Sequence, residues 1–144
     1  MIARPKRFGV AALIGVLTAF SLPPWGWWLL TPIGLAAGWW WIGHSTESAA
    51  GSWRFWKSAR FWTAWWFFAG FYLVALVWMI DLTIPGWFVS IPVEAGIMAF
   101  PLALVGDRKP ATRLPAALVL GEAIRWVVPF GGVPMANLAL GQVG

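Results

Sequence analysis

The sequence contains no cysteine, a single histidine and a single tyrosine, and only 10% of its 144 residues are charged. Without cysteine the chain has no disulfide, no thiolate metal ligand and no cysteine nucleophile. His44 is the one imidazole, so we expect no metal site. A soluble domain carries about 25% charged residues, and the scarcity of charge therefore argues against a soluble globular protein.

The motifs of common enzyme and cofactor classes are also missing. The sequence has no GxSxG, no P-loop, no HExxH and no dinucleotide-binding glycine pattern. Ser21 and Ser90 have no histidine or lysine at a spacing that suggests a nucleophile and its base. Composition and spacing alone therefore predict no bound cofactor and assign no reaction.

Apolar and aromatic residues are abundant. Hydrophobic residues make up 60% of the chain, and 14 residues are tryptophan. Long apolar runs predict transmembrane helices, and tryptophans at their ends are typical of the aromatic belts of a bilayer. We predict an all-α, polytopic membrane helix bundle with about five transmembrane or re-entrant helices, over residues 8–22, 31–43, 61–80, 87–105 and 114–130.

Local signals refine three of these segments. Thr31 followed by Pro32 predicts a helix N-cap with proline at the first helical position. Gly34 and Gly38 form a small-residue motif that favours close contact between helices. Residues 61–80 form the clearest transmembrane helix, whereas residues 8–22 are short for a full span.

The basic residues predict an orientation. Of ten, three precede the first apolar run, three lie in residues 54–60 and three in residues 108–113. The loops at 23–26 and 81–86 have none. By the positive-inside rule the N-terminus is cytoplasmic and the loop after Phe130 is extracytoplasmic. Because the charges alternate with apolar runs and form no basic face, we expect membrane lipids and no nucleic acid as partners.

The tenth basic residue, Arg125, lies in the last apolar segment together with Glu122. The two are three residues apart and share one helix face. A charge at the centre of a lone membrane helix costs roughly 2.5–3.5 kcal/mol on insertion scales. Two interpretations stay open: an intrahelical ion pair that supports insertion and packing, or the lining of a polar cavity that opens toward the outer face.

Glu94 lies in the fourth apolar segment, near Pro92. An acid within a membrane segment is a candidate functional residue, although it could also be protonated or bonded to a neighbouring helix. Asp81 is expected to be a solvated residue at a helix end. The aromatic residues Tyr72 and Trp78 fit packing and lipid contact better than a ligand cage.

The order of these features resembles the N-terminal membrane part of the apolipoprotein N-acyltransferase family. The resemblance rests on Ala19-Phe20-Ser21 with Pro24 and Trp27-Trp28, on Gly70-Phe71 through Val77-Trp78 with Pro85-Gly86, and on Glu122-Ala123-Ile124-Arg125-Trp126 with Gly132-Val133-Pro134 and Gln142. The last group is similar to a family signature that reads roughly E-x-x-R, then G-F-P-W, then G-Y-S-Q. This chain departs from that signature at Met135, which stands in place of the tryptophan, and at Leu140-Gly141, which replaces the Tyr-Ser.

The resemblance implies a specific activity. Enzymes of this family transfer an acyl chain from a phospholipid donor to the free α-amino group of the diacylglyceryl-cysteine that begins a lipoprotein. They are multi-pass proteins of the bacterial cytoplasmic (inner) membrane. Their catalytic Glu, Lys and Cys lie in a nitrilase-like domain on the outer side, which we expect beyond residue 144. Residues 1–144 would then form the N-terminal membrane domain, inactive alone and without catalytic residues.

Under this resemblance, the candidates for lining a substrate cavity are Glu94, Glu122, Arg125, Gln142 and Trp78. Two alternatives remain for the whole chain. It could be a self-contained small membrane protein, such as a transporter subunit or an assembly scaffold. It could also be the membrane anchor of a polyprenol-phosphate mannosyltransferase. A downstream sequence without the catalytic Glu, Lys and Cys would favour either alternative.

Overall fold

The computed structural model of the protein describes residues 4–44, 55–104 and 110–128. These residues form helices and the turns between them, with no strand among them, which confirms the predicted all-α class. The elements in chain order are α1 (Arg4–Ala19), α2 (Leu30–Gly43), the 3-10 helix η1 (Phe55–Lys57), α3 (Ala59–Ala75), the 3-10 helix η2 (Val77–Asp81), α4 (Ile84–Leu104) and α5 (Pro110–Val127).

One helix in the described ranges, α4, is long and apolar enough to cross a membrane, with 21 residues and a mean hydropathy of 1.6. Half of its apolar segment is buried inside the molecule, and the mostly buried core helix of a soluble protein can have the same length and composition. The helices α1, α2 and α3 are shorter, with 16, 14 and 17 residues. The structure thus confirms five α-helices, while their arrangement as a polytopic membrane bundle stays a prediction.

The first two helices differ from prediction at their ends. Helix α1 begins at Arg4 rather than residue 8, because arginine and lysine are good helix formers and Pro5 is accepted in the first turn. It ends at Ala19, and turns follow in which the amides of Ser21 and Leu22 bond to carbonyls three residues earlier. Helix α2 begins at Leu30 and has no side-chain cap, so the predicted Thr31 cap is wrong.

The predicted continuous helix over residues 61–80 is also wrong. Helix α3 begins at Ala59, because the Ser58 hydroxyl accepts a hydrogen bond of 3.1 Å from the Phe61 amide and caps the helix. It ends at Ala75, and η2 turns the chain toward α4. Leu76 and Met79 of this turn are buried in the core, and that packing favours the tighter 3-10 geometry over a longer α-helix.

Helices α4 and α5 both begin earlier than the predicted residues 87 and 114. The Thr83 hydroxyl accepts a hydrogen bond of 3.3 Å from the Gly86 amide, which caps α4 three residues before the predicted start. Helix α5 begins at Pro110, a residue suited to the first helical position. It ends at Val127, two residues before Pro129, since a proline disfavours helical geometry in the residue before it.

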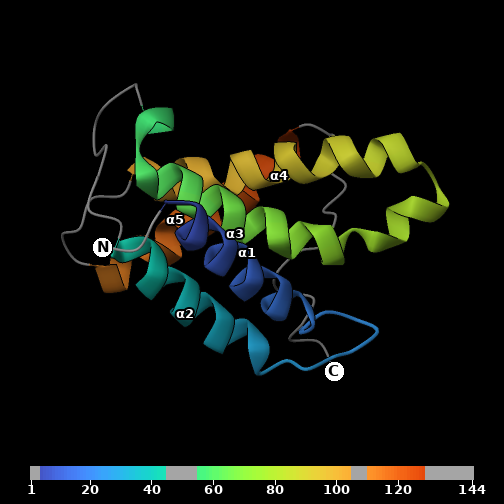
Figure 1. The fold of residues 1–144 in the computed structure, drawn as a ribbon, viewed down its shortest axis with the longest axis horizontal. Coiled ribbons are helices and arrows are strands. Elements are labelled where there is room, and N and C mark those ends of the chain that lie inside the picture. Colours follow the sequence, from blue (N-terminus) through green and yellow to red (C-terminus); the bar gives the residue numbers. More distant parts are fainter. Residues whose placement is uncertain (1–3, 45–54, 105–109, 129–144) are drawn as a thin grey trace.

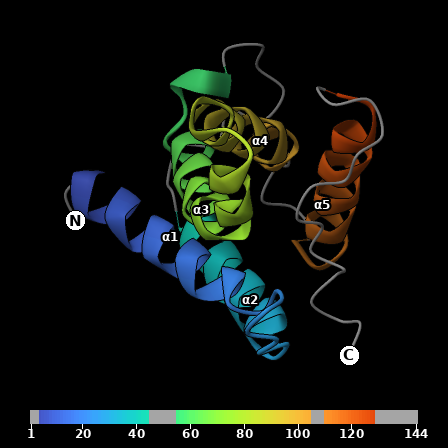
Figure 2. The ribbon, with the colours of Figure 1, turned by 90° about the vertical axis from the view of Figure 1, so that its right-hand side faces the viewer.

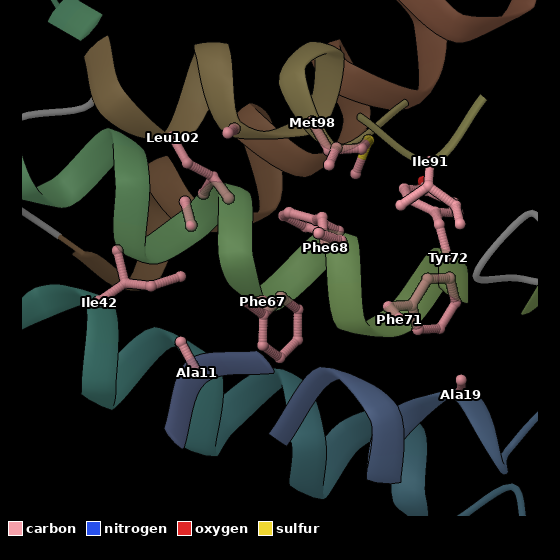
Figure 3. Close-up of a cluster of buried hydrophobic side chains, with 14 of the residues drawn as sticks. Ala11, Ala19, Ile42, Phe67, Phe68, Phe71, Tyr72, Ile91, Met98 and Leu102 are labelled. Carbon is pink, nitrogen blue, oxygen red and sulfur yellow. The ribbon is translucent and has the colours of Figure 1, made fainter. Parts of the chain in front are cut away.

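Helix α3 is the centre of the bundle (Figures 1 and 2). Helices α1 and α2 cover one side of it, α4 lies against another side, and α5 packs mainly on α4. The core contains Phe67, Phe68, Phe71 and Tyr72 of α3, between small residues of α1 and larger apolar residues of α4 (Figure 3). Every other element is therefore positioned by α3, directly or through α4.

Glycines allow the closest helix contacts. A methyl group at Gly15 would overlap the Phe67 carbonyl of α3, and one at Gly70 would overlap the Ala12 carbonyl of α1. Gly34 faces Thr18, and Gly38 faces the Phe67 ring, which confirms the contact role predicted for the Gly34–Gly38 motif.

Successive helices run in alternating directions, so their starts lie at alternate ends of the bundle. The starts of α1, α3 and α5 lie at the left in Figure 1, and the turn at 20–29 and η2 lie at the right. At the left end, Arg7 Nη2 donates to the Trp41 carbonyl at 3.2 Å, and Trp41 Nε1 donates to the Arg7 carbonyl at 3.0 Å. The described basic residues other than Arg125 all lie toward this end, which is called the basic end below.

Candidate functional site

Arg125 is the centre of a buried polar cluster, although it lies on an otherwise apolar helix. Its Nε donates a hydrogen bond of 2.5 Å to Glu94 Oε2, and its Nη1 lies 3.0 Å from both oxygens of Glu122. Arg125 and Glu94 are 3% and 2% exposed, whereas the Glu122 side chain is 17% exposed. We call these three residues the Glu-Arg-Glu triad; Glu122 is its accessible edge.

The helix packing explains how the triad forms. Glu122 and Arg125 lie one turn apart on α5, so they share a face. Helices α4 and α5 run in opposite directions, as the contact of Met98 with Gly121 and that of Glu94 with Arg125 show. That pairing brings together an acid and a base that are 31 residues apart in the sequence.

Tyr72 of α3 is the fourth member of the cluster. The guanidinium carbon of Arg125 lies 4.9 Å from the centroid of its ring, within the range of a cation–π contact. Tyr72 is fully buried, and its hydroxyl has no hydrogen-bond partner among the described residues. From the sequence alone, Tyr72 is predicted to serve packing and lipid contact. A signal was available, because the only tyrosine among 10 phenylalanines and 14 tryptophans is the only aromatic residue with a hydroxyl group.

The triad contains two carboxyl groups for one guanidinium. If all three are ionised, these three side chains together carry one net negative charge, and Glu122 is the most exposed of them. Burial of an arginine and a carboxylate is tolerated where they pair and hydrogen-bond, and it becomes costly once one partner is removed. The arrangement can therefore hold α3, α4 and α5 in one register, and it presents a carboxylate at its edge.

The structure brings three of the five predicted cavity residues together, namely Glu94, Glu122 and Arg125. Trp78 lies on η2 with 46% of its surface exposed and makes no hydrogen bond or ring contact with the triad. Gln142 lies outside the described residues. Whether these residues line a substrate cavity stays a prediction.

His44 and Asp81, two further polar residues that the sequence singles out, lie away from the triad. His44 follows α2, where its Nδ1 lies 2.6 Å from the Trp40 carbonyl oxygen, and Asp81 is exposed at the end of η2. In the ranges that the structure describes, no three histidine, cysteine or acidic residues are grouped so that they could hold a metal ion.

Comparison with known proteins places these features in a family. Residues 14–144 match the family model of the apolipoprotein N-acyltransferase N-terminal domain. No curated protein and no solved structure matches the chain significantly. The match covers the five α-helices except the first ten residues of α1, and it includes the whole triad.

Proposed function

Because the chain belongs to the apolipoprotein N-acyltransferase N-terminal domain family, we propose that it forms the membrane domain of such an enzyme. The parent enzyme would transfer an acyl chain from a phospholipid to the N-terminal diacylglyceryl-cysteine of lipoproteins. The family match over residues 14–144 is the observation that carries this proposal. The nitrilase-like catalytic domain would follow residue 144, and residues 1–144 would be inactive alone.

The exposed surface supports a lipid environment. Large apolar side chains are exposed on every helix, among them Leu13 at 58%, Ile33 at 59%, Phe88 at 63% and Val119 at 68%. A soluble monomer rarely exposes contiguous apolar patches of more than a few hundred Å². In the hydrocarbon core of a bilayer, such a surface avoids the free-energy cost of contact between apolar groups and water.

We propose a topology with the basic end in the cytoplasm. The turn at 20–29 and η2 would then face the extracytoplasmic side, and α5 runs toward that side from its start at the basic end. Exposed tryptophans lie at both ends: Trp25, Trp27, Trp28 and Trp78 at this end, and Trp40 and Trp56 at the basic end, are all at least 39% exposed. Tryptophan is enriched at both headgroup levels of a bilayer, which supports a membrane location, while the orientation rests on the basic residues.

In this proposal the triad fixes the position of α5 relative to α4. It ties the last turns of α5 to the middle of α4, and the catalytic domain would follow on the same side. Glu122 is the most exposed of the three, with 17% of its side chain accessible, and we propose that a polar group of a lipid or lipoprotein substrate approaches it beside the contacts that it already makes.

The test is complementation in a bacterium depleted of its own apolipoprotein N-acyltransferase. The gene that contains this chain, with its downstream sequence, is expected to restore growth and the third acyl chain on lipoproteins, measured by mass spectrometry of their N-terminal peptides. A product that accumulates in the membrane and leaves the lipoproteins diacylated would contradict the proposal.

A further inference from the structure

An apolar groove lies away from the triad, in the half of the bundle toward the basic end. Its empty volume is about 220 Å³, part of it open to the surroundings. Its lining comes from four helices and includes Leu35 and Trp39 of α2, Phe67 of α3, Leu102 of α4, and Leu114 and Leu118 of α5. Every lining residue is apolar.

The position of α5 explains the groove. Helix α5 packs on α4 and diverges from α2, so the two helices form opposite walls (Figure 2). Phe67 and Phe68 of the central helix form the floor. Because the lining offers no polar side chain, a polar headgroup would lose its hydrogen bonds there, whereas hydrocarbon would not.

The rim of the groove has one exposed basic residue, Arg113, which directly precedes Leu114. Arg60 is buried behind Trp39, with its guanidinium carbon 5.4 Å from the centroid of that ring, and is not offered to a ligand. The described acidic residues, Asp81, Glu94 and Glu122, all lie outside this end. The rim thus complements an anionic group and the interior complements an alkyl chain.

We propose that the groove holds a segment of one acyl chain of an anionic phospholipid, with the phosphate beside Arg113. The inference rests on the proposed function in one respect, since it requires the chain to lie in a bilayer. In the proposed topology this lipid belongs to the cytoplasmic leaflet, and the acyl donor to the opposite one.

The probe is phosphatidylglycerol, compared with phosphatidylcholine of the same acyl chains, added to the 144-residue chain in detergent. Native mass spectrometry gives the lipid-bound fraction. Leu118→Trp fills the groove, and Val119→Trp places the same ring on the neighbouring exposed position. We expect Leu118→Trp to lower the fraction bound to phosphatidylglycerol at least five-fold and Val119→Trp to change it less than two-fold. Equal fractions in the two variants would overturn the proposal.

A second pair of variants covers the case in which Leu118→Trp does not fold. The chain has no cysteine, so Leu118→Cys and Val119→Cys each provide one thiol, which a long alkyl methanethiosulfonate modifies after the protein has folded. Modification at position 118 is expected to displace the bound lipid, and modification at position 119 to leave it in place. Displacement at neither position would contradict occupancy of the groove.

The charge at the rim has its own test. Arg113→Ala should lower binding of phosphatidylglycerol several-fold without changing that of phosphatidylcholine, and Arg113→Lys should restore it. Lys6→Ala, an exposed residue at the same end, is the control for general charge. If Lys6→Ala acts as strongly as Arg113→Ala, the phosphate is not held at the groove.

The two proposals fail in different ways. If the groove variants lose the lipid but lipoproteins are not acylated in the complementation test, the proposed function is wrong and the lipid site stands. If acylation is restored and Leu118→Trp binds lipid as the unmodified chain does, only the lipid site is wrong. If the chain forms a stable dimer and Leu118→Trp breaks it, a second copy of the chain covers the groove. This result would also overturn the lipid site.

Discussion

Arg125 bonds to two carboxyl groups and lies over the Tyr72 ring, and its side chain is almost completely buried inside the protein. Each of these contacts compensates for burial of its charge. Glu94, which is 2% exposed, depends on Arg125 in turn. Glu122 depends on it less, because its side chain is 17% exposed. Loss of the ion pair of Glu94 and loss of that of Glu122 should therefore change the free energy of unfolding by different amounts.

Arg125→Ala leaves the Glu94 carboxyl buried without its ion pair. We expect it to lower the free energy of unfolding by about 3–5 kcal/mol, as removal of one partner from a buried pair does. Glu122→Gln should cost about 1 kcal/mol or less, since partly exposed pairs contribute little. Denaturant unfolding of the purified chain in detergent measures both values. Equal losses for the two variants would contradict the asymmetry of the triad.

A double variant separates packing from function. Glu94→Leu with Arg125→Met replaces the ion pair by apolar side chains of similar size, a change that is often nearly neutral for stability. If stability and lipoprotein acylation both recover, the triad serves packing. If stability alone recovers, a charge of the triad takes part in handling the substrate.

At the scale of helices, α1 and α3 meet at glycines. A methyl group at Gly15 or Gly70 would overlap a backbone carbonyl of the other helix, and a carbonyl cannot move aside as a flexible side chain can. Gly9, which lies on α1 as Gly15 does, is the control position, because a methyl group there meets nothing within 4 Å.

Gly70→Ala is expected to destabilise the chain by about 1–3 kcal/mol, because the overpacked helices must separate. Gly9→Ala should stabilise it by about 0.5–1 kcal/mol through helix propensity alone. The midpoints of thermal unfolding in detergent compare the two variants. A midpoint for Gly70→Ala at or above that of the unmodified chain would show that α1 and α3 are not in close contact at this position.

The same elements show how far the sequence could predict the structure. The five helices were predictable because each is a long apolar run. The Gly34–Gly38 contact was predictable because its spacing forms a known motif, whereas Gly15 and Gly70 lie on different helices and no spacing connects them. The end of α3 at Ala75 depends on the burial of Leu76 and Met79 in the core.

The triad illustrates the same limit. Glu94, Glu122 and Arg125 stood out because each is a charge in an apolar segment. Their meeting could not be predicted, because it depends on the register between α4 and α5, which the core packing of Met98 and its neighbours sets.

At the scale of the whole molecule, charge divides the bundle into two unlike ends. The basic end contains Lys6, Arg7 and Lys57, and exposed tryptophans lie at both ends, in the turn at 20–29 and at Trp40 and Trp56. Apolar side chains cover the surface between them. A bilayer matches this order of polar, apolar and polar zones, and the proposed function depends on it.

Cysteine accessibility tests that order most directly, because the chain has no cysteine of its own. Trp28→Cys places a thiol in the turn at 20–29, and Lys57→Cys places one on η1; both positions are exposed. In spheroplasts treated with a membrane-impermeant maleimide, we predict labelling of Trp28→Cys, and labelling of Lys57→Cys only after the membrane is permeabilised. Labelling of Lys57→Cys in intact spheroplasts, with Trp28→Cys protected or equally labelled, would contradict the account.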